Sequence, residues 1–274
     1  MANDRNIQLG ISTSIIPGSV ITTDILQMIR THPFEVIEIG YEHAGPALTD
    51  QTLYDGLVSV CRDALPPIFS IHAPYRPERD ISELDEQKRQ TAVAHAIEAL
   101  QLAEDMGVGL VVVHGSQDPV RPGTRPERLL QSHRSLGELV AAARTRNVRV
   151  ALEMMPPEWL PAGSTEAHAM LDGLDPRIIG YCLDTNHANL TGDLTDIIHA
   201  LADRLWSIHL SDNDGIKQQH WMPFEGIIDF PSMLSALDDI GYCGPVMYEL
   251  DYHPEGPEKG LEEVAANFEK LCAY

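Results

Sequence analysis

The sequence predicts a single (β/α)₈ barrel, or TIM barrel, and three observations support this fold class. The chain has 274 residues, and such a barrel typically needs about 250 residues. Short apolar runs rich in Val and Ile recur along the chain, and helical stretches lie between them. Strands that alternate with helices are typical of a parallel α/β fold. We therefore expect residues 1–274 to form one domain, with its active site at the carboxyl ends of the strands.

The predicted strands are apolar on successive residues rather than on alternate ones. This pattern is typical of strands buried on both faces, as in a parallel sheet. Eight runs over this length favour a closed barrel over an open, doubly wound sheet. In chain order they are Ile7–Ser12, Val36–Gly40, Ile68–His72, Val108–His114, Val148–Glu153, Ile178–Asp184, Leu205–His209 and Val246–Glu249.

Five helices are clear from the spacing of their apolar residues and from their ends. In the longest of them, Ser82 is the expected N-cap, Asp85 stands at the third helical position and Gly107 follows the end. Two others begin with proline in the first turn, where a missing N–H costs nothing. The five are Ser82–Met106, Arg128–Arg146, Asp193–Ala202, Pro231–Ile240 and Pro257–Cys272.

Charge and cysteine content exclude several classes of protein. Lys and Arg number 19 against 41 Asp and Glu, which gives a net charge of −22. Because nucleic acids and anionic membranes are bound through Lys and Arg, we expect neither as a partner. No apolar run approaches a transmembrane length, and the first ten residues lack the pattern of a secretory signal. The four cysteines form no C-x-x-C pair. We expect free, mostly buried thiols in a cytoplasmic protein.

Titratable residues end most of the apolar runs, and they are the candidate functional residues. A charged or imidazole group directly after a buried run is costly without a partner. Any one of them alone could be a solvated strand end or a helix cap. Several titratable side chains gathered at the carboxyl end of one barrel need a cation or shared protons to offset their charges, which favours a metal site. They are Glu38, His72, His114, Glu153, Asp184, His187, His209 and Glu249.

Four of these residues form the expected ligand set. Glu153, Asp184, His209 and Glu249 offer three carboxylates and one imidazole. Oxygen-rich sets with an imidazole suit Mn²⁺, Mg²⁺ or Co²⁺ better than they suit a sulfur-bound structural zinc. We expect one divalent metal, with Mn²⁺ preferred and Zn²⁺, Co²⁺ or Mg²⁺ as alternatives.

Motifs spread from Ile7 to Glu249 resemble those of the xylose-isomerase-like TIM barrels. They are H-A-P-Y at 72–75, H-G-S at 114–116, L-E at 152–153, L-D-T-N-H at 183–187, H-L-S-D at 209–212, I-D-F at 228–230 and Y-E-L at 248–250. That group includes metal-dependent sugar epimerases and isomerases, inosose dehydratases and apurinic nucleases of the endonuclease-IV type. The motifs together identify the group and say little about the substrate.

The resemblance first implies a ketose epimerase or an aldose–ketose isomerase. In such enzymes a metal polarises the carbonyl, and two glutamates on opposite faces of the substrate transfer a proton through an enediolate. Glu153 and Glu249 would be that acid/base pair, and His187 would contact a substrate oxygen. An inosose-type dehydratase would use the same enediolate. The other candidate substrate contacts are His72, His114, Glu158, Arg76 and His220.

The nature of the substrate stays open at this stage. Arg76, close to H-A-P-Y, is a candidate for binding a substrate anion. Four arginines in the loop after the fourth strand could also bind an anion, or could simply lie at a solvated helix start. They are Arg121, Arg125, Arg128 and Arg134. Glu158 could be an exposed loop residue instead of a substrate contact. We expect a small sugar or polyol as the substrate, and relatives of this kind often form homo-oligomers.

An alternative that the resemblance also implies is an endonuclease-IV-like zinc phosphodiesterase. Those enzymes hold three zinc ions through additional histidines, which His72, His114, His187 and His220 match. However, Gln218 stands where the nuclease has an Asp, two residues before the histidine matched by His220. The net charge of −22 is also unfavourable for holding a DNA duplex. A non-catalytic sugar-binding barrel is a third interpretation, which no sequence feature supports directly.

Overall fold

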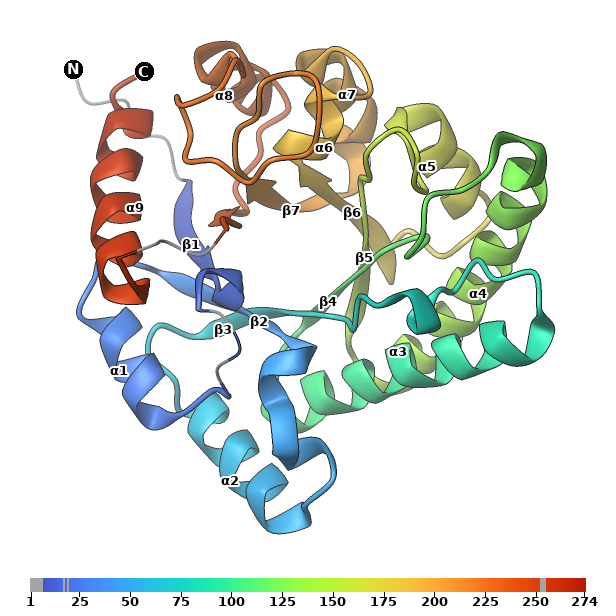
Figure 1. Cartoon of the computed structure of the whole chain (residues 1–274), viewed down its shortest axis with the longest axis horizontal. Helices are drawn as coiled ribbons and strands as arrows, with labels where there is room; N and C mark the ends of the chain where they lie inside the picture. Colours follow the sequence, from blue (N-terminus) through green and yellow to red (C-terminus); the bar gives the residue numbers. More distant parts are fainter. Residues whose placement is uncertain (1–6, 17, 19, 252–254) are drawn as a thin grey trace.

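Eight parallel strands close into a barrel in the computed structural model, which describes residues 7–16, 18, 20–251 and 255–274 (Figure 1). Each strand pairs with the next along the chain, and β8 pairs with β1. The predicted (β/α)₈ barrel is therefore confirmed. The strands are β1 (Gln8–Ser12), β2 (Val36–Gly40), β3 (Ile68–His72), β4 (Leu110–Val113), β5 (Arg149–Glu153), β6 (Ile179–Asp184), β7 (Leu205–Leu210) and β8 (Pro245–Tyr248).

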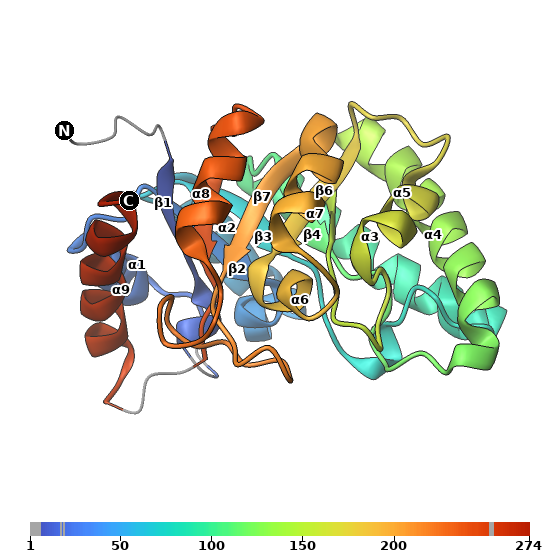
Figure 2. The same ribbon diagram turned by 90° about the horizontal axis from the view of Figure 1, so that it is seen from above.

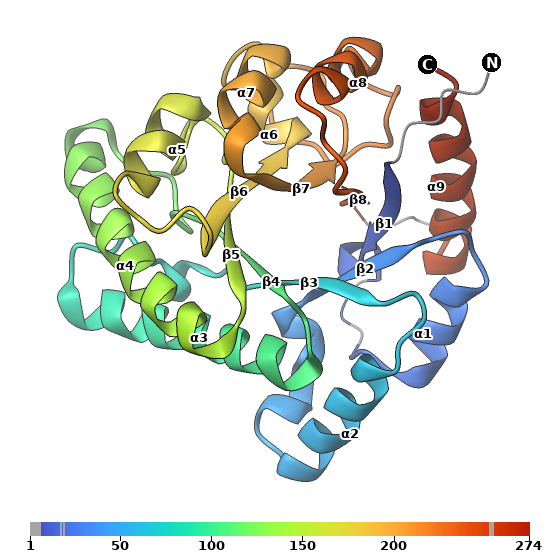
Figure 3. The same cartoon turned by 180° about the vertical axis from the view of Figure 1, so that it is seen from behind.

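Helices surround the barrel on its outer side, as the opposite views of Figures 1 and 3 show. The five predicted helices are present, with ends that shift by up to four residues, and α1, α2, α5 and α6 were not predicted. The helices are α1 (Thr23–Arg30), α2 (Gln51–Arg62), α3 (Glu86–Met106), α4 (Arg125–Arg146), α5 (Gly163–Leu171), α6 (Thr185–Asn189), α7 (Leu194–Leu201), α8 (Phe230–Asp239) and α9 (Pro257–Cys272).

The start of α3 corrects one prediction. Asp85, not Ser82, caps this helix: its carboxylate accepts the backbone N–H groups of Gln87 and Lys88 at 3.0 and 3.1 Å. The Ser82 hydroxyl instead donates to buried Asp80 at 2.6 Å. The Asp80 carboxylate therefore draws Ser82 into the preceding turn, and the helix begins four residues later than expected. Gly107 ends the helix in the left-handed conformation, with φ of 74°, as expected.

The interior of the barrel separates an apolar end from a polar one. Leu110, Val112, Ala151 and Cys182 pack inside the barrel, with Phe69 and Trp206 against them. Several of these residues lie early in their strands, so apolar packing closes the amino end. The carboxyl ends carry titratable residues instead, and α6 and the β7–α8 connection lie at that same end (Figure 2).

Two further expectations concern membranes and thiols. Within the described part of the chain, no helix combines the length and apolar character needed to cross a membrane. All four cysteines are free, as expected. Cys61 and Cys182 are buried, but Cys243 and Cys272 are exposed, so the expectation of mostly buried thiols is wrong for half of them.

Candidate metal centre and active site

A cavity of about 460 Å³ opens at the carboxyl end of the barrel. Its walls contain six of the predicted site residues, which are His72, His114, Glu153, His187, His220 and Glu249. Asp184 and His209 are fully buried, beside Glu153 and Glu249 in space. The structure thus brings eight of the ten predicted site residues to one place.

The four predicted metal ligands converge within this group. One ligand atom from each of Glu153, Asp184, His209 and Glu249 lies within 4.8 Å of all the others. The strand register explains part of this convergence, because Asp184 at the end of β6 pairs with His209 on β7. Glu153 ends β5, and Glu249 directly follows β8. These four side chains, from the carboxyl ends of four different strands, therefore lie close together.

Asp184 is held by the helix that follows it. Its Oδ1 accepts the backbone N–H of His187 at 2.8 Å and so caps the short helix α6. This bond fixes the carboxylate, while the buried Oδ2 has no hydrogen-bond partner among the described residues. A buried carboxylate oxygen without a donor is costly, unless a cation satisfies it.

His209 is oriented in a comparable way. Its Nε2 lies 3.1 Å from Oε1 of Glu38, and its Nδ1 points to the opposite side. This Nδ1 lies 2.9 Å from Glu249 Oε2 and 3.5 Å from Glu153 Oε2. It makes no hydrogen bond within the described part of the protein. The nitrogen therefore lies among carboxylates, a position that stabilises either a proton or a bound cation.

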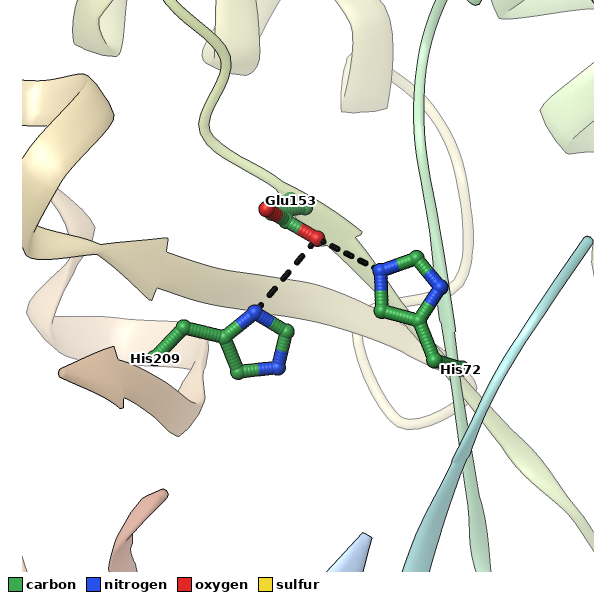
Figure 4. A group of neighbouring side chains, drawn as sticks. All are labelled: His72, Glu153 and His209. Carbon is green, nitrogen blue, oxygen red and sulfur yellow. Dashed lines mark hydrogen bonds and ion pairs between the residues drawn. The ribbon is translucent and has the colours of Figure 1, made fainter. Parts of the chain in front are cut away.

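Three more histidines surround Glu153. Nε2 of His72 and Nε2 of His114 lie 3.1 and 3.2 Å from the same carboxylate oxygen, Oε2. Figure 4 shows His72 and His209 approaching Glu153 from two sides. Nδ1 of His187 donates to the carbonyl of Met154 at 2.9 Å and lies 3.4 Å from Glu153 Oε1. His187 Nε2 is buried without a hydrogen-bond partner in the described structure.

The carboxylates and the imidazoles of this cluster stabilise one another's charged forms. Burial opposes the charged imidazolium of His72 and of His187, but the neighbouring carboxylates outweigh it and raise both pKa values to about 9. Burial likewise disfavours the ionised form of Glu153, yet His114 and His209 hold the pKa of that carboxyl well below its usual range. Burial raises the pKa of Asp184. The positive charge of the protonated histidines thus offsets the negative charge of the carboxylates, which a bound cation could offset instead.

The donor set fits a hard or borderline divalent cation. It contains three carboxylates and one imidazole, with an unpartnered oxygen on Asp184 and an unpartnered nitrogen on His209. Asp184, His187 and His220 form another group whose ligand atoms lie within 4.8 Å of one another. In that group, however, Nε2 of His220 lies 3.1 Å from the side-chain nitrogen of Gln218, and its Nδ1 lies 3.1 Å from the carbonyl of Glu249. Both nitrogens of His220 are therefore already occupied.

Two predicted substrate contacts lie elsewhere. Glu158 is exposed and is not among the described residues that line the cavity. Arg76 lines a neighbouring cavity of about 490 Å³ and lies 3.7 Å from Glu42. Their roles stay predictions. The arginines after β4 make ion pairs with carboxylates, since Arg125 contacts Glu166, Arg128 contacts Asp80 and Arg134 contacts Glu86.

The structure adds two residues to which the sequence assigned no role. Glu38 is the one charged residue in the apolar run Val36–Gly40, so it was visible in the sequence, but its contact with His209 was not. His43 lies in a 3₁₀ segment, Tyr41–Leu48, and lines both cavities. Thr13 Oγ1 accepts the N–H of Gly40 at 3.0 Å and lies 2.7 Å from Nδ1 of His43. The Thr13 hydroxyl can then donate to Nδ1, which leaves an Nε2–H donor on His43.

The fold and the site together define a class: a (β/α)₈ barrel whose candidate metal ligands gather at the carboxyl ends of its strands. Within this class, the chain belongs to the xylose isomerase-like TIM barrel family, whose model matches residues 26–271. This match confirms the resemblance seen in the motifs.

Individual relatives within this family have different names. An uncharacterized protein of Methanocaldococcus jannaschii is 25 % identical over 89 % of this chain and 84 % of its own length. L-ribulose-5-phosphate 3-epimerase UlaE of Salmonella paratyphi C is 22 % identical over 95 % of this chain and 92 % of its own. A probable endonuclease 4 of Acholeplasma laidlawii is 29 % identical over 67 % of this chain and 62 % of its own.

Solved structures share the fold over nearly the whole chain. A D-tagatose 3-epimerase-like protein superposes with a TM-score of 0.82 at 22 % identity, covering 97 % of this chain and 98 % of its own. The IOLI protein with a bound zinc atom has a TM-score of 0.82 at 19 % identity, with the same coverage of both chains. At these identities the likeness establishes the architecture alone.

Proposed function

We propose that the protein is a divalent-metal-dependent sugar isomerase or epimerase that works by proton transfer through an enediolate. One observation carries the proposal: four side chains from four strands place ligand atoms within 4.8 Å of one another, and Asp184 Oδ2 and His209 Nδ1 have no hydrogen-bond partner in the described structure. The names of the ribulose-phosphate and tagatose epimerase relatives support sugar chemistry. We infer a small sugar or polyol substrate and one functional domain over residues 1–274.

Glu153, Asp184, His209 and Glu249 would hold one metal ion, with Mn²⁺ preferred over Zn²⁺, Co²⁺ or Mg²⁺ on the chemistry of the donors. When bound, such an ion supplies Lewis acidity toward a ketose carbonyl and its neighbouring hydroxyl. The IOLI structure, a similar barrel, is described with a bound zinc atom, which supports a metal in this fold.

Glu153 and Glu249 would then move the substrate proton. Both carboxyl groups have pKa values held below the ordinary range by nearby histidines against the effect of burial, so both are ionised and can act as bases. One ionised glutamate takes the proton from the carbon. The other first takes up a proton from solvent and then returns it from the opposite face to give the epimer, so the substrate carbon gains a solvent proton. Return to the adjacent carbon would give the isomer, and loss of a neighbouring hydroxyl would give the inosose-type dehydration.

Histidines on the cavity wall would bind the substrate. His187 has its Nδ1–H engaged with Met154, so its buried Nε2 is available for a substrate oxygen. His72 and His114 contact Glu153 Oε2 and would orient this carboxylate toward the reacting carbon. His220 is fixed by Gln218 and Glu249 at the rim.

The test is to incubate the Mn²⁺-loaded protein with a panel of ketoses and inososes in D₂O and to follow the reacting carbon by NMR. We expect deuterium at that carbon, and we expect Glu153→Gln and Glu249→Gln to abolish its incorporation. Glu258→Gln is the matched control, because Glu258 is an exposed glutamate on α9. Turnover without deuterium would exclude the proton-transfer mechanism and would indicate a hydride shift.

One observation favours a second candidate function, a zinc phosphodiesterase of the endonuclease-IV type. His72 and His114 both contact Glu153 Oε2, an arrangement in which this carboxylate could bridge two ions. The Acholeplasma laidlawii relative is named a probable endonuclease. Against it, the amide of Gln218 occupies the free nitrogen of His220, and the net charge is −22. We expect one metal ion per chain by elemental analysis and no nicking of an abasic duplex, whereas two or three zinc ions with efficient nicking would favour the phosphodiesterase.

A further inference from the structure

Glu38 is a fully buried carboxylate that the proposed mechanism does not use. It lies inside the barrel at the middle of β2, where its strand partner on β3 is Ser70. Among the described residues, no Lys or Arg makes an ion pair with it, and the basic group in contact is His209. Burying a carboxylate on two polar contacts is expensive, so its presence calls for an explanation.

The contacts of Glu38 all lead toward His209. Nε2–H of His209 donates to Glu38 Oε2 at 3.2 Å, and Nε2 lies 3.1 Å from Oε1. The Ser70 hydroxyl donates to the same Oε2 at 2.7 Å and fixes the carboxylate from the adjacent strand. Glu38 thereby dictates which nitrogen of His209 carries a proton, because Nε2–H is required for the bond.

We propose that Glu38 is a positioning residue that acts through His209 and sets the metal affinity of the site. By holding the Nε2 proton, it leaves the Nδ1 lone pair facing Glu153 and Glu249, at 3.5 and 2.9 Å. A carboxylate on the far nitrogen also raises the basicity of the ligating one, and loss of such a partner typically costs about 10–100-fold in metal affinity. Ser70 would contribute only by orienting Glu38. This inference rests on the metal site of the proposed function.

The test is Co²⁺ binding to the metal-free, full-length protein, followed by calorimetry and by visible absorption. Glu38→Gln removes the charge at nearly constant volume, and we expect a dissociation constant about 10–100-fold higher with an altered absorption band. Glu38→Asp keeps the charge but withdraws it by one methylene, so it should also weaken binding. Ser70→Ala should weaken binding less, and it should add nothing in the Glu38→Gln background, as expected for two residues acting as one unit.

Glu35→Gln is the matched control, since Glu35 is an exposed glutamate beside the start of the same strand. It should bind Co²⁺ like the wild type. Folded Glu38→Gln and Glu38→Asp variants with wild-type affinity and an unchanged spectrum would overturn the inference. If Glu38→Gln does not fold, Glu38→Asp and Ser70→Ala decide it. Absence of Co²⁺ binding by the wild-type protein would instead refute the metal site of the proposed function, and this inference with it.

Discussion

Metal binding should release protons, because histidine protons take the place of the cation in the metal-free site. The pKa of His209 is raised well above its usual value: burial opposes this shift, and the carboxylates of Glu249, Glu38 and Glu153 cause it. To bind a metal through Nδ1, this imidazolium must lose a proton. His72 has a pKa of about 9, so about 99 % of it is protonated at pH 7. We therefore expect at least one proton released per metal ion at pH 7.

The magnitude follows from this stoichiometry. One proton released per ion makes the affinity rise about tenfold per pH unit, until the pH passes the raised pKa of His209. Calorimetric titration with Mn²⁺ in two buffers of different ionisation enthalpy counts the protons directly. His95→Ala on α3, which is away from the cluster, should leave the count unchanged. Identical enthalpies in both buffers, with a dissociation constant independent of pH between about 6 and 8, would refute the charge balance described for the site.

Other predictions concern stability and substrate binding. The pKa of His72 in the folded protein is above its ordinary value of 6.5, so its stabilising contribution is complete below pH 6.5 and is lost as pH rises through about 9. At about 1.4 kcal/mol per pKa unit this is up to about 3 kcal/mol, and urea titrations of metal-free protein at both pH values should show it. Asp85→Ala should lower the free energy of unfolding by about 1 kcal/mol through loss of the α3 cap, whereas an unchanged urea midpoint would contradict the assigned cap. His43→Gln and Thr13→Val should raise KM for an accepted ketose without changing Mn²⁺ affinity; unchanged KM in both variants would exclude His43 as a substrate donor.

The fold and the ligand set were predictable from the sequence because both depend on local patterns. Runs of buried Val and Ile identify parallel strands, and the residue that ends each run lies at the carboxyl end of the barrel. Glu153 and Asp184 illustrate this directly, since each ends its strand as predicted. Apolar spacing does not reveal α6, which has 5 residues, or α5, which is weakly amphipathic. In contrast, α1 and α2 are amphipathic and begin with the capping residues Thr22 and Asp50, so their sequences do carry helix signals. Ser82 was misplaced because Asp80 competes for its hydroxyl, which is a contact that no spacing rule reveals.

Contacts between segments that are distant in the sequence were not predictable. The role proposed for Glu38 depends on such a contact. Glu38 and His209 are 171 positions apart, and only barrel closure brings them together. Glu158 illustrates the converse. It lies five residues after Glu153, and the loop that follows β5 leaves it exposed, which the spacing alone does not reveal. A residue's place at a strand end is a local property, whereas its hydrogen-bond partner depends on the register of strands that the sequence does not specify.

The choice between one ion and several depends on which lone pairs are free. His209 Nδ1 and Asp184 Oδ2 have no hydrogen-bond partner among the described residues, so a single ion between them breaks no hydrogen bond and displaces only the proton on His209. An ion on His220 would instead have to displace the amide of Gln218, which cannot supply the negative charge that an Asp would bring. Gln218→Asp is therefore an informative variant. It should free His220 Nε2 and add a carboxylate, so we expect zinc content to rise from about one toward two ions per chain in metal analysis. An unchanged stoichiometry would show that Gln218 is not what limits the site to one ion.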